Sequence, residues 1–108
     1  MKVVLLVEDD PHTGSALQRW ISRLGYEVHL VKSVAEAKQA IGSSTDLAAV
    51  ITDFHLGDGL GTEVEHVAKL NGVHCVIYSG DPDALMGHVV INKADLQALT
   101  NWLLNNAE

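Results

Sequence analysis

Four short, largely apolar runs in this chain each end at a residue with a polar or charged side chain. The runs cover residues 3–7, 48–52, 75–78 and 89–92, and they are followed by Glu8, Asp9 and Asp10, by Asp53, by Ser79 and by Lys93. Runs of this length that are rich in β-branched residues are typical of strands buried on both faces of a parallel sheet. Because such a sheet forms its ligand site outside the carboxyl ends of its strands, we expect these polar groups to meet at one edge.

The segments between the apolar runs have the patterns of helices. In residues 11–24 apolar side chains recur at helical spacing, and Ser33 followed by Glu36 is the capping-box pattern of a helix start. We expect helices at residues 11–24, 33–42, 62–70 and 94–105, and strands at residues 3–7, 28–31, 47–52, 74–78 and 88–91. The glycine-rich stretch 57–61 predicts an irregular loop. The alternation predicts a single α/β domain over residues 1–108 with a doubly wound, five-stranded parallel sheet.

The composition argues against several classes of protein. Hydrophobic residues make up 47% of the chain, which argues against disorder, and no apolar run approaches the roughly 20 residues that span a bilayer. A net charge of −7 argues against a nucleic-acid-binding domain, which typically has an excess of basic residues. The sequence also lacks the basic amphipathic helix that is typical of membrane-surface binding. The single cysteine, Cys75, cannot form an internal disulfide and is expected to be buried, so we expect a cytoplasmic protein.

Three carboxylates are predicted to lie together, those of Glu8, Asp9 and Asp53. Clustered like charges repel one another unless a cation neutralises them. Hard oxygen ligands favour Mg²⁺, which usually binds one or two carboxylates and keeps several waters. Zinc is disfavoured because the six histidines, His55 among them, lack the paired spacing of zinc sites. Asp53 is the candidate nucleophile, since a carboxylate whose charge is screened can attack phosphorus.

A hydroxyl and an ammonium complete this set. Ser79 can donate to a phosphoryl oxygen, while Lys93 can pair first with a carboxylate and then with the phosphoryl group. Gly80, beside the serine, leaves room for that group. Each of these residues is common on its own, so the indication lies in the order along the chain: acid, acid, hydroxyl and lysine, each after an apolar run.

This order resembles the receiver domain of two-component response regulators, and the resemblance covers nearly the whole chain. It implies a flavodoxin-like sheet of strand order 2-1-3-4-5, with Asp53 as the phosphoacceptor for a sensor histidine kinase or a phosphotransfer protein. It also implies that Asp9 and Asp53 bind Mg²⁺ directly. Glu8 would then act through water, and the backbone carbonyl of His55 would be a third protein ligand. Such a domain is a signalling switch for a downstream protein effector and not a turnover enzyme.

Three features depart from the family pattern. Gly57 stands four residues after Asp53, where the family usually has a proline, and Ala94 replaces the proline that usually follows Lys93. The interval between the hydroxyl and the lysine is short for the family by roughly two helical turns. We therefore expect the fourth helix, within residues 80–87, to be shortened or absent. A protein partner or a homodimer is then expected to cover what this segment exposes.

Two other functions remain open. A pseudo-receiver of the same fold would be a phosphorylation-independent protein-interaction module, although the complete set of acids, hydroxyl and lysine argues against it. A phosphatase of the haloacid dehalogenase type also uses an aspartyl nucleophile. That family needs a second aspartate two residues after the first, where this chain has His55 after Asp53.

Overall fold

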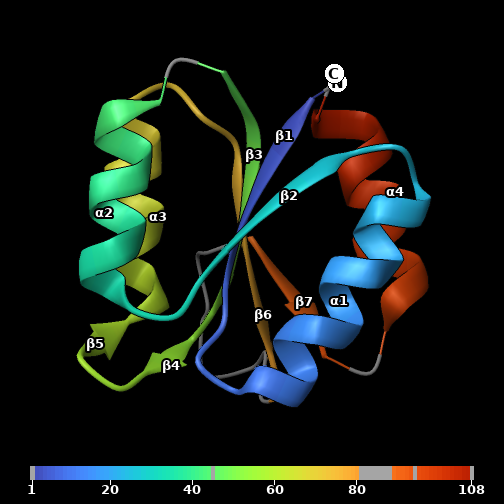
Figure 1. The fold of residues 1–108 in the computed structure, drawn as a ribbon, viewed down its shortest axis with the longest axis horizontal. Coiled ribbons are helices and arrows are strands. Elements are labelled where there is room, and N and C mark those ends of the chain that lie inside the picture. Colours follow the sequence, from blue (N-terminus) through green and yellow to red (C-terminus); the bar gives the residue numbers. More distant parts are fainter. Residues whose placement is uncertain (1, 45, 81–88, 94, 108) are drawn as a thin grey trace.

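The structure, a computed structural model, describes residues 2–44, 46–80, 89–93 and 95–107. Its main sheet has five strands: β1 (Val3–Val7), β2 (Glu27–Val31), β3 (Leu47–Asp53), β6 (Cys75–Ser79) and β7 (Val90–Asn92). All neighbouring pairs are parallel, and the order across the sheet is β2-β1-β3-β6-β7 (Figure 1). Counted along the chain, these five strands confirm the predicted order 2-1-3-4-5.

Four helices among the described residues cover both faces of this sheet. α1 (Pro11–Arg23) and α4 (Leu96–Asn106) lie on one face, and α2 (Val34–Ser43) and α3 (Gly61–Leu70) lie on the other (Figure 1). None of them is both long enough and apolar enough to cross a bilayer. The doubly wound architecture is confirmed. The prediction of a shortened fourth helix concerns a segment of which residues 81–87 lie outside the described residues.

The three central strands β1, β3 and β6 are buried on both faces because their side chains pack alternately into two separate cores. In β1, Val4 and Leu6 pack in the core with α1 and α4, while Leu5 and Val7 pack in the core with α2 and α3. All four are fully buried, as the continuous apolar pattern predicts. Cys75 belongs to the second core, and burial raises the pKa of its thiol to about 12, so the predicted buried thiol is confirmed.

The prediction of an irregular loop at residues 57–61 was wrong. β4 (His55–Leu56) and β5 (Gly59–Leu60) form a two-stranded antiparallel ribbon directly after β3. The ribbon closes where Gly61 N donates a hydrogen bond of 2.6 Å to the Phe54 carbonyl. This close approach needs glycine, because a Cβ on Gly61 would collide with the carbonyl at the end of β3. Gly61 therefore permits the close backbone approach at which the ribbon ends.

The helix boundaries agree with the predicted ranges to within two residues, and three helices are capped by side chains. Asp10, Ser33 and Asp95 accept hydrogen bonds from backbone N–H groups in the first turns of α1, α2 and α4. The capping box predicted for α2 is only half formed, because Glu36 accepts from Lys32 N and not from the N–H of the capping serine. The cap at Asp95 also explains why α4 begins at residue 96 and not at residue 94.

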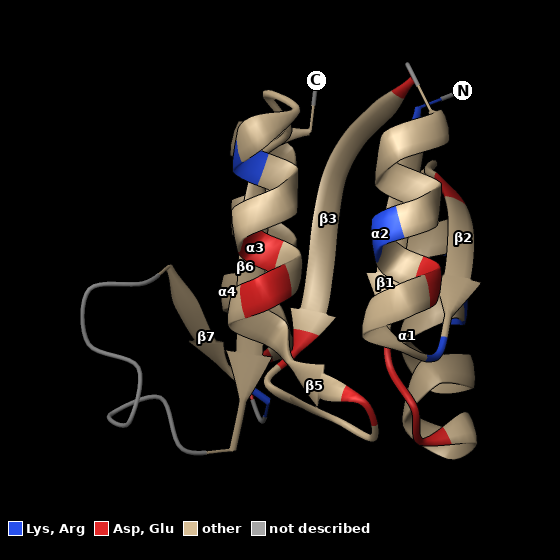
Figure 2. Cartoon of the chain, turned by 90° about the vertical axis from the view of Figure 1, so that its left-hand side faces the viewer, with Lys and Arg blue, Asp and Glu red and all other residues tan. Residues whose placement is uncertain are grey.

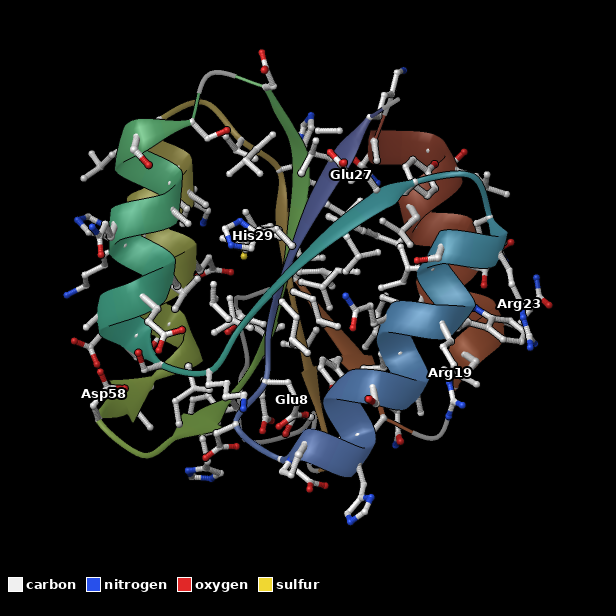
Figure 3. All side chains as sticks on the ribbon, viewed as in Figure 1. Glu8, Arg19, Arg23, Glu27, His29 and Asp58 are labelled. Atoms are coloured by element: carbon white, nitrogen blue, oxygen red, sulfur yellow. The ribbon has the colours of Figure 1, made fainter. Side chains whose placement is uncertain are left out.

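The tip of the β4–β5 ribbon supplies a second cap for α2. Asp58 Oδ1 accepts from Val34 N over 2.8 Å, and Asp58 Oδ2 accepts from Ala35 N over 3.1 Å. Figure 3 shows Asp58 beside the start of this helix. The two hydrogen bonds hold the pKa of the Asp58 carboxyl below its ordinary value, because they stabilise the charged form. The ribbon that follows β3 is thereby tied to α2.

Asp58→Ala is expected to lower the melting temperature at pH 7, because the first turn of α2 loses both acceptors. Since the folded-state pKa is depressed, the Asp58 carboxylate stabilises the fold above the pKa of the unfolded chain. That contribution is lost as the pH falls through the folded-state pKa. The difference in melting temperature between the wild type and Asp58→Ala should therefore persist at neutral pH and shrink below about pH 4.

Asp58→Asn is the matched control, because its amide keeps one acceptor oxygen but cannot ionise. It should melt between the wild type and Asp58→Ala at pH 7, and its difference from Asp58→Ala should not change with acid. Equal melting temperatures for the wild type and Asp58→Ala at pH 7 would contradict the capping role.

Candidate functional site

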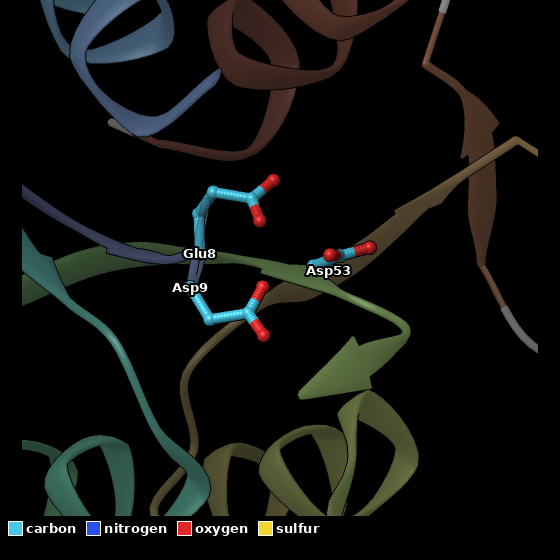
Figure 4. Close-up of side chains that lie close together, drawn as sticks. All are labelled: Glu8, Asp9 and Asp53. Carbon is cyan, nitrogen blue, oxygen red and sulfur yellow. The ribbon is translucent and has the colours of Figure 1, made fainter. Parts of the chain in front are cut away.

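The carboxyl ends of β1 and β3 bring three carboxylates together. Glu8 and Asp9 directly follow β1, Asp53 ends β3, and these two strands are neighbours in the sheet. Oxygens of the three carboxylates lie within 4.8 Å of one another (Figure 4). Glu8 and Asp53 are buried, whereas Asp9 is exposed. The acidic cluster expected from the sequence is therefore present, and Figure 2 shows acidic residues at the ends of both strands on the same edge of the molecule.

Lys93, just after β7, brings a positive charge to this cluster. Its Nζ lies 3.0 Å from Asp53 Oδ1 and 3.9 Å from Glu8 Oε1. Asp53 Oδ1 also accepts a hydrogen bond of 2.8 Å from Phe54 N. The Asp53 side chain is only 10% exposed, so these contacts replace much of the hydration that its carboxylate loses on folding. The structure thus brings the predicted lysine to the candidate nucleophile.

Glu8 makes a contact that the sequence analysis missed. Tyr78 donates its hydroxyl to Glu8 Oε1, and Asp10 N donates to Glu8 Oε2 over 3.1 Å. Burial raises the pKa of the Glu8 carboxyl, while the hydrogen bond from Tyr78 opposes that rise. The only signal in the sequence was position, since Tyr78 immediately precedes Ser79. An aromatic residue within an apolar run is equally typical of a buried core, so the pattern did not single it out.

Ser79 and His55 lie at the same edge of the sheet. Ser79 ends β6 and is buried, and its carbonyl accepts a hydrogen bond of 3.0 Å from Lys93 N. This backbone contact sets the predicted hydroxyl residue and the predicted lysine side by side. His55 begins β4 with an exposed side chain, and its ring centroid lies 4.6 Å from that of Phe54. A bond from the Ser79 hydroxyl to a phosphoryl group and metal coordination by the His55 carbonyl stay predictions.

The residues of the cluster fit Mg²⁺ by their donor chemistry. Within the described ranges, Glu8, Asp9 and Asp53 are the one group of acidic, histidine or cysteine side chains close enough to share an ion, and all three offer hard oxygens. The charge of Asp53 adds to the rise in the pKa of Glu8, a sign of repulsion between the two buried carboxylates. A divalent cation would relieve this repulsion, whereas the donor set offers nothing that favours zinc.

Comparisons with known proteins were made for sequence and for structure. No protein-family model matches the chain. An uncharacterized transcriptional regulatory protein of Bacillus subtilis (strain 168), YrkP, is 37% identical over 71 residues, which are 65% of this chain and 30% of that protein. The chain therefore matches less than a third of the length of this curated relative.

Solved receiver domains share the fold over nearly the whole chain. The signal receiver domain of an HD domain-containing protein from Pseudomonas fluorescens Pf-5 superposes with a TM-score of 0.83 at 21% identity, covering 97% of this chain and 93% of the other. A response regulator receiver protein from Sinorhizobium medicae WSM419 gives 0.79 at 21% identity, covering 99% and 97%. The receiver domain of a sensor histidine kinase from Pseudomonas aeruginosa PAO1, which has a magnesium ion in its active site cleft, gives 0.78 at 20%, covering 96% and 98%.

The chain thus has the flavodoxin-like fold of response-regulator receiver domains, and the resemblance predicted from the sequence is confirmed at that level. The acidic cluster and its lysine lie at the carboxyl ends of the strands, where an open α/β sheet places its ligand site.

Proposed function

We propose that this chain is a phosphorylation-dependent signalling switch that accepts a phosphoryl group on Asp53 with the help of Mg²⁺. One observation carries the proposal: the buried Asp53 carboxylate lies 3.0 Å from Lys93 Nζ and beside two further carboxylates, at the edge of a receiver-type sheet. A structural domain gains little from like charges clustered at a partly buried edge, since each must be stripped of water.

In the proposed phosphoryl transfer, Asp53 is the nucleophile and the other acidic residues of the cluster hold the cation. A carboxylate oxygen of Asp53 forms a bond to phosphorus, and the P–N bond of a donor phosphohistidine breaks with its electron pair left on the imidazole. Glu8 and Asp9 are positioned to hold the cation, with Asp53 and the His55 carbonyl as the other proposed protein ligands. Mg²⁺, when bound, would neutralise the phosphoryl oxygens and the clustered carboxylates.

The two remaining residues act on the transferred group itself. Lys93 pairs with Asp53 before the reaction and can turn to a phosphoryl oxygen afterwards, since its flexible ammonium can reorient. Ser79, at the end of the neighbouring strand, is proposed to donate its hydroxyl to another phosphoryl oxygen. The protein assists its own phosphorylation and dephosphorylation in this way, and we do not propose it as a turnover enzyme.

The proposed phosphoryl donor is a sensor histidine kinase or a phosphotransfer protein, and the proposed reader of the signal is a downstream protein effector. Two solved proteins of the same fold are named as receiver domains of histidine kinases, and the curated relative is named as a transcriptional regulatory protein. We place this exchange in the cytoplasm. Neither nucleic acid nor membrane is proposed as a direct partner of this acidic chain, and homodimerisation remains an expectation.

The test is phosphorylation by a small acyl phosphate in the presence of Mg²⁺, followed by intact mass spectrometry. The wild type is expected to gain one phosphoryl group, and Asp53→Asn is expected to gain none because an amide is not a nucleophile for phosphorus. Asp46→Asn is the control, since it makes the same substitution just before the opposite end of β3 and should be labelled like the wild type.

Labelling of Asp53→Asn to the wild-type level would contradict the assignment of the phosphoacceptor. A wild type that takes no label, with or without Mg²⁺, would instead favour the phosphorylation-independent interaction module.

A further inference from the structure

Tyr78 is the one aromatic side chain among the described residues that touches two charged groups of the site. It lies in β6, where its register partner in β3 is Asp53 and its register partner in β7 is Ile91. Its ring belongs to the core beneath α1 and α4, and the residue is only 3% exposed. Its hydroxyl nevertheless reaches past β3 to the carboxylate that follows β1. The Tyr78 side chain therefore extends from the end of β6, past β3, to the end of β1.

The first charged group that Tyr78 touches is the Glu8 carboxylate. The Glu8 side chain is only 1% exposed, so protein donors must replace the water that would otherwise solvate it. The Tyr78 hydroxyl occupies Oε1, and Asp10 N occupies Oε2. With a donor on each oxygen, the plane of the carboxylate is fixed.

The second charged group is the Lys93 ammonium. Its Nζ lies 5.1 Å from the centre of the Tyr78 ring, within the range of a cation–π interaction. The same ammonium is 3.0 Å from Asp53 and 3.9 Å from Glu8. The Tyr78 side chain thus contacts the Glu8 carboxylate through its hydroxyl and the Lys93 ammonium through its ring.

We propose that Tyr78 is a positioning residue that sets the affinity of the site for Mg²⁺ by holding the Glu8 carboxylate in place. The inference rests on the proposed function, because it assumes that Glu8 faces the cation, directly or through water. Groups that orient a metal-binding carboxylate typically change metal affinity by about 10- to 100-fold when they are removed. Simple core packing does not explain the hydroxyl, since phenylalanine would fill the same space without bringing a polar group into the core.

The test is the Mg²⁺ affinity of Tyr78→Phe, measured by calorimetric titration of the unphosphorylated protein. The substitution keeps the ring and removes only the donor, so the dissociation constant is expected to rise about 10-fold. Tyr26→Phe is the matched control: it deletes a hydroxyl that donates to the Leu103 carbonyl at 3.4 Å, so it should leave the Mg²⁺ affinity unchanged.

A double-mutant cycle separates positioning from packing. If Tyr78 acts through Glu8, then Tyr78→Phe should weaken Mg²⁺ binding in the wild-type background and have no further effect in Glu8→Ala. Equal losses in both backgrounds would overturn the inference. Wild-type affinity in Tyr78→Phe would also overturn it, and so would a Tyr78→Phe protein that no longer unfolds cooperatively, because that residue would then be structural.

The titration and the phosphoryl-labelling assay together distinguish failure of the proposed function from failure of the role of Tyr78. A wild type that binds no Mg²⁺ refutes both the proposed cofactor and the role of Tyr78. A wild type that binds Mg²⁺ and takes the phosphoryl label, with Tyr78→Phe indistinguishable from it, refutes the role of Tyr78 alone.

Discussion

Gly61→Ala is expected to lower the free energy of unfolding by about 3 kcal/mol, the largest stability effect that we predict for a single methyl group in this chain. A Cβ at Gly61 would collide with the Asp53 carbonyl and would lie 3.1 Å from Phe54 Cα. Both obstacles are backbone atoms, so no side chain can turn aside to make room. The hydrogen bond of 2.6 Å from Gly61 N to the Phe54 carbonyl holds the segments together at this point.

The same substitution should also reduce phosphorylation, since relief of the collision must move the backbone of the proposed phosphoacceptor. Denaturant unfolding measures the first effect, and intact mass after treatment with an acyl phosphate measures the second. Gly57→Ala is the matched control in the same ribbon, because a Cβ there meets nothing within 4 Å. It should change the unfolding free energy by no more than about 0.5 kcal/mol. Equal stabilities for Gly61→Ala and Gly57→Ala would show that the ribbon can open at no cost.

Lys93→Gln is expected to slow phosphorylation of Asp53 about 100-fold, the scale of loss when a positioned electrostatic donor is removed from a reacting site. The glutamine can still donate a hydrogen bond, but the charge 3.0 Å from Asp53 Oδ1 is gone. The negative charge of the entering phosphoryl group then meets the clustered carboxylates without a protein cation beside them. The rate of mass gain with a small acyl phosphate and Mg²⁺ measures this effect.

Lys38→Gln is the control for the loss of one positive charge. Lys38 forms an exposed ion pair with Glu63 at 3.8 Å, away from the acidic cluster, so its substitution should leave the labelling rate near that of the wild type. Similar rates for Lys93→Gln and the wild type would mean that the contact between Lys93 and Asp53 has no part in the transfer. A fall of equal size in both variants would point to net charge and not to position.

The sheet and the position of the acids could be predicted because both follow from local patterns. A short apolar run that is rich in β-branched residues, such as residues 3–7, predicts a buried strand, and the residue after it lies at the strand end. All parallel strands present their carboxyl ends at one edge, so Glu8, Asp53 and Lys93 were expected together without any knowledge of distances.

The ribbon of β4 and β5 could not be predicted in this way. Each of its strands has two residues, which is too short to show a periodic pattern, and the glycines around them are equally typical of a loop. Asp58 illustrates the same limit. It caps α2, a helix that begins 24 residues earlier in the chain, so nothing near Asp58 in the sequence identifies its partner.

Residue order and apolar spacing were thus enough to establish the five strands of the main sheet and the polar groups that follow or end them. Burial of a strand or helix face leaves an apolar pattern within a few neighbouring residues, and that pattern can be read locally. The folded molecule alone decided which side chains those groups meet. Glu8 and Tyr78 are 70 residues apart, and their hydrogen bond exists because β3 separates β1 from β6 by the distance that a tyrosine side chain can cross. Such a contact depends on strand separation and side-chain length together, and no local pattern encodes either one.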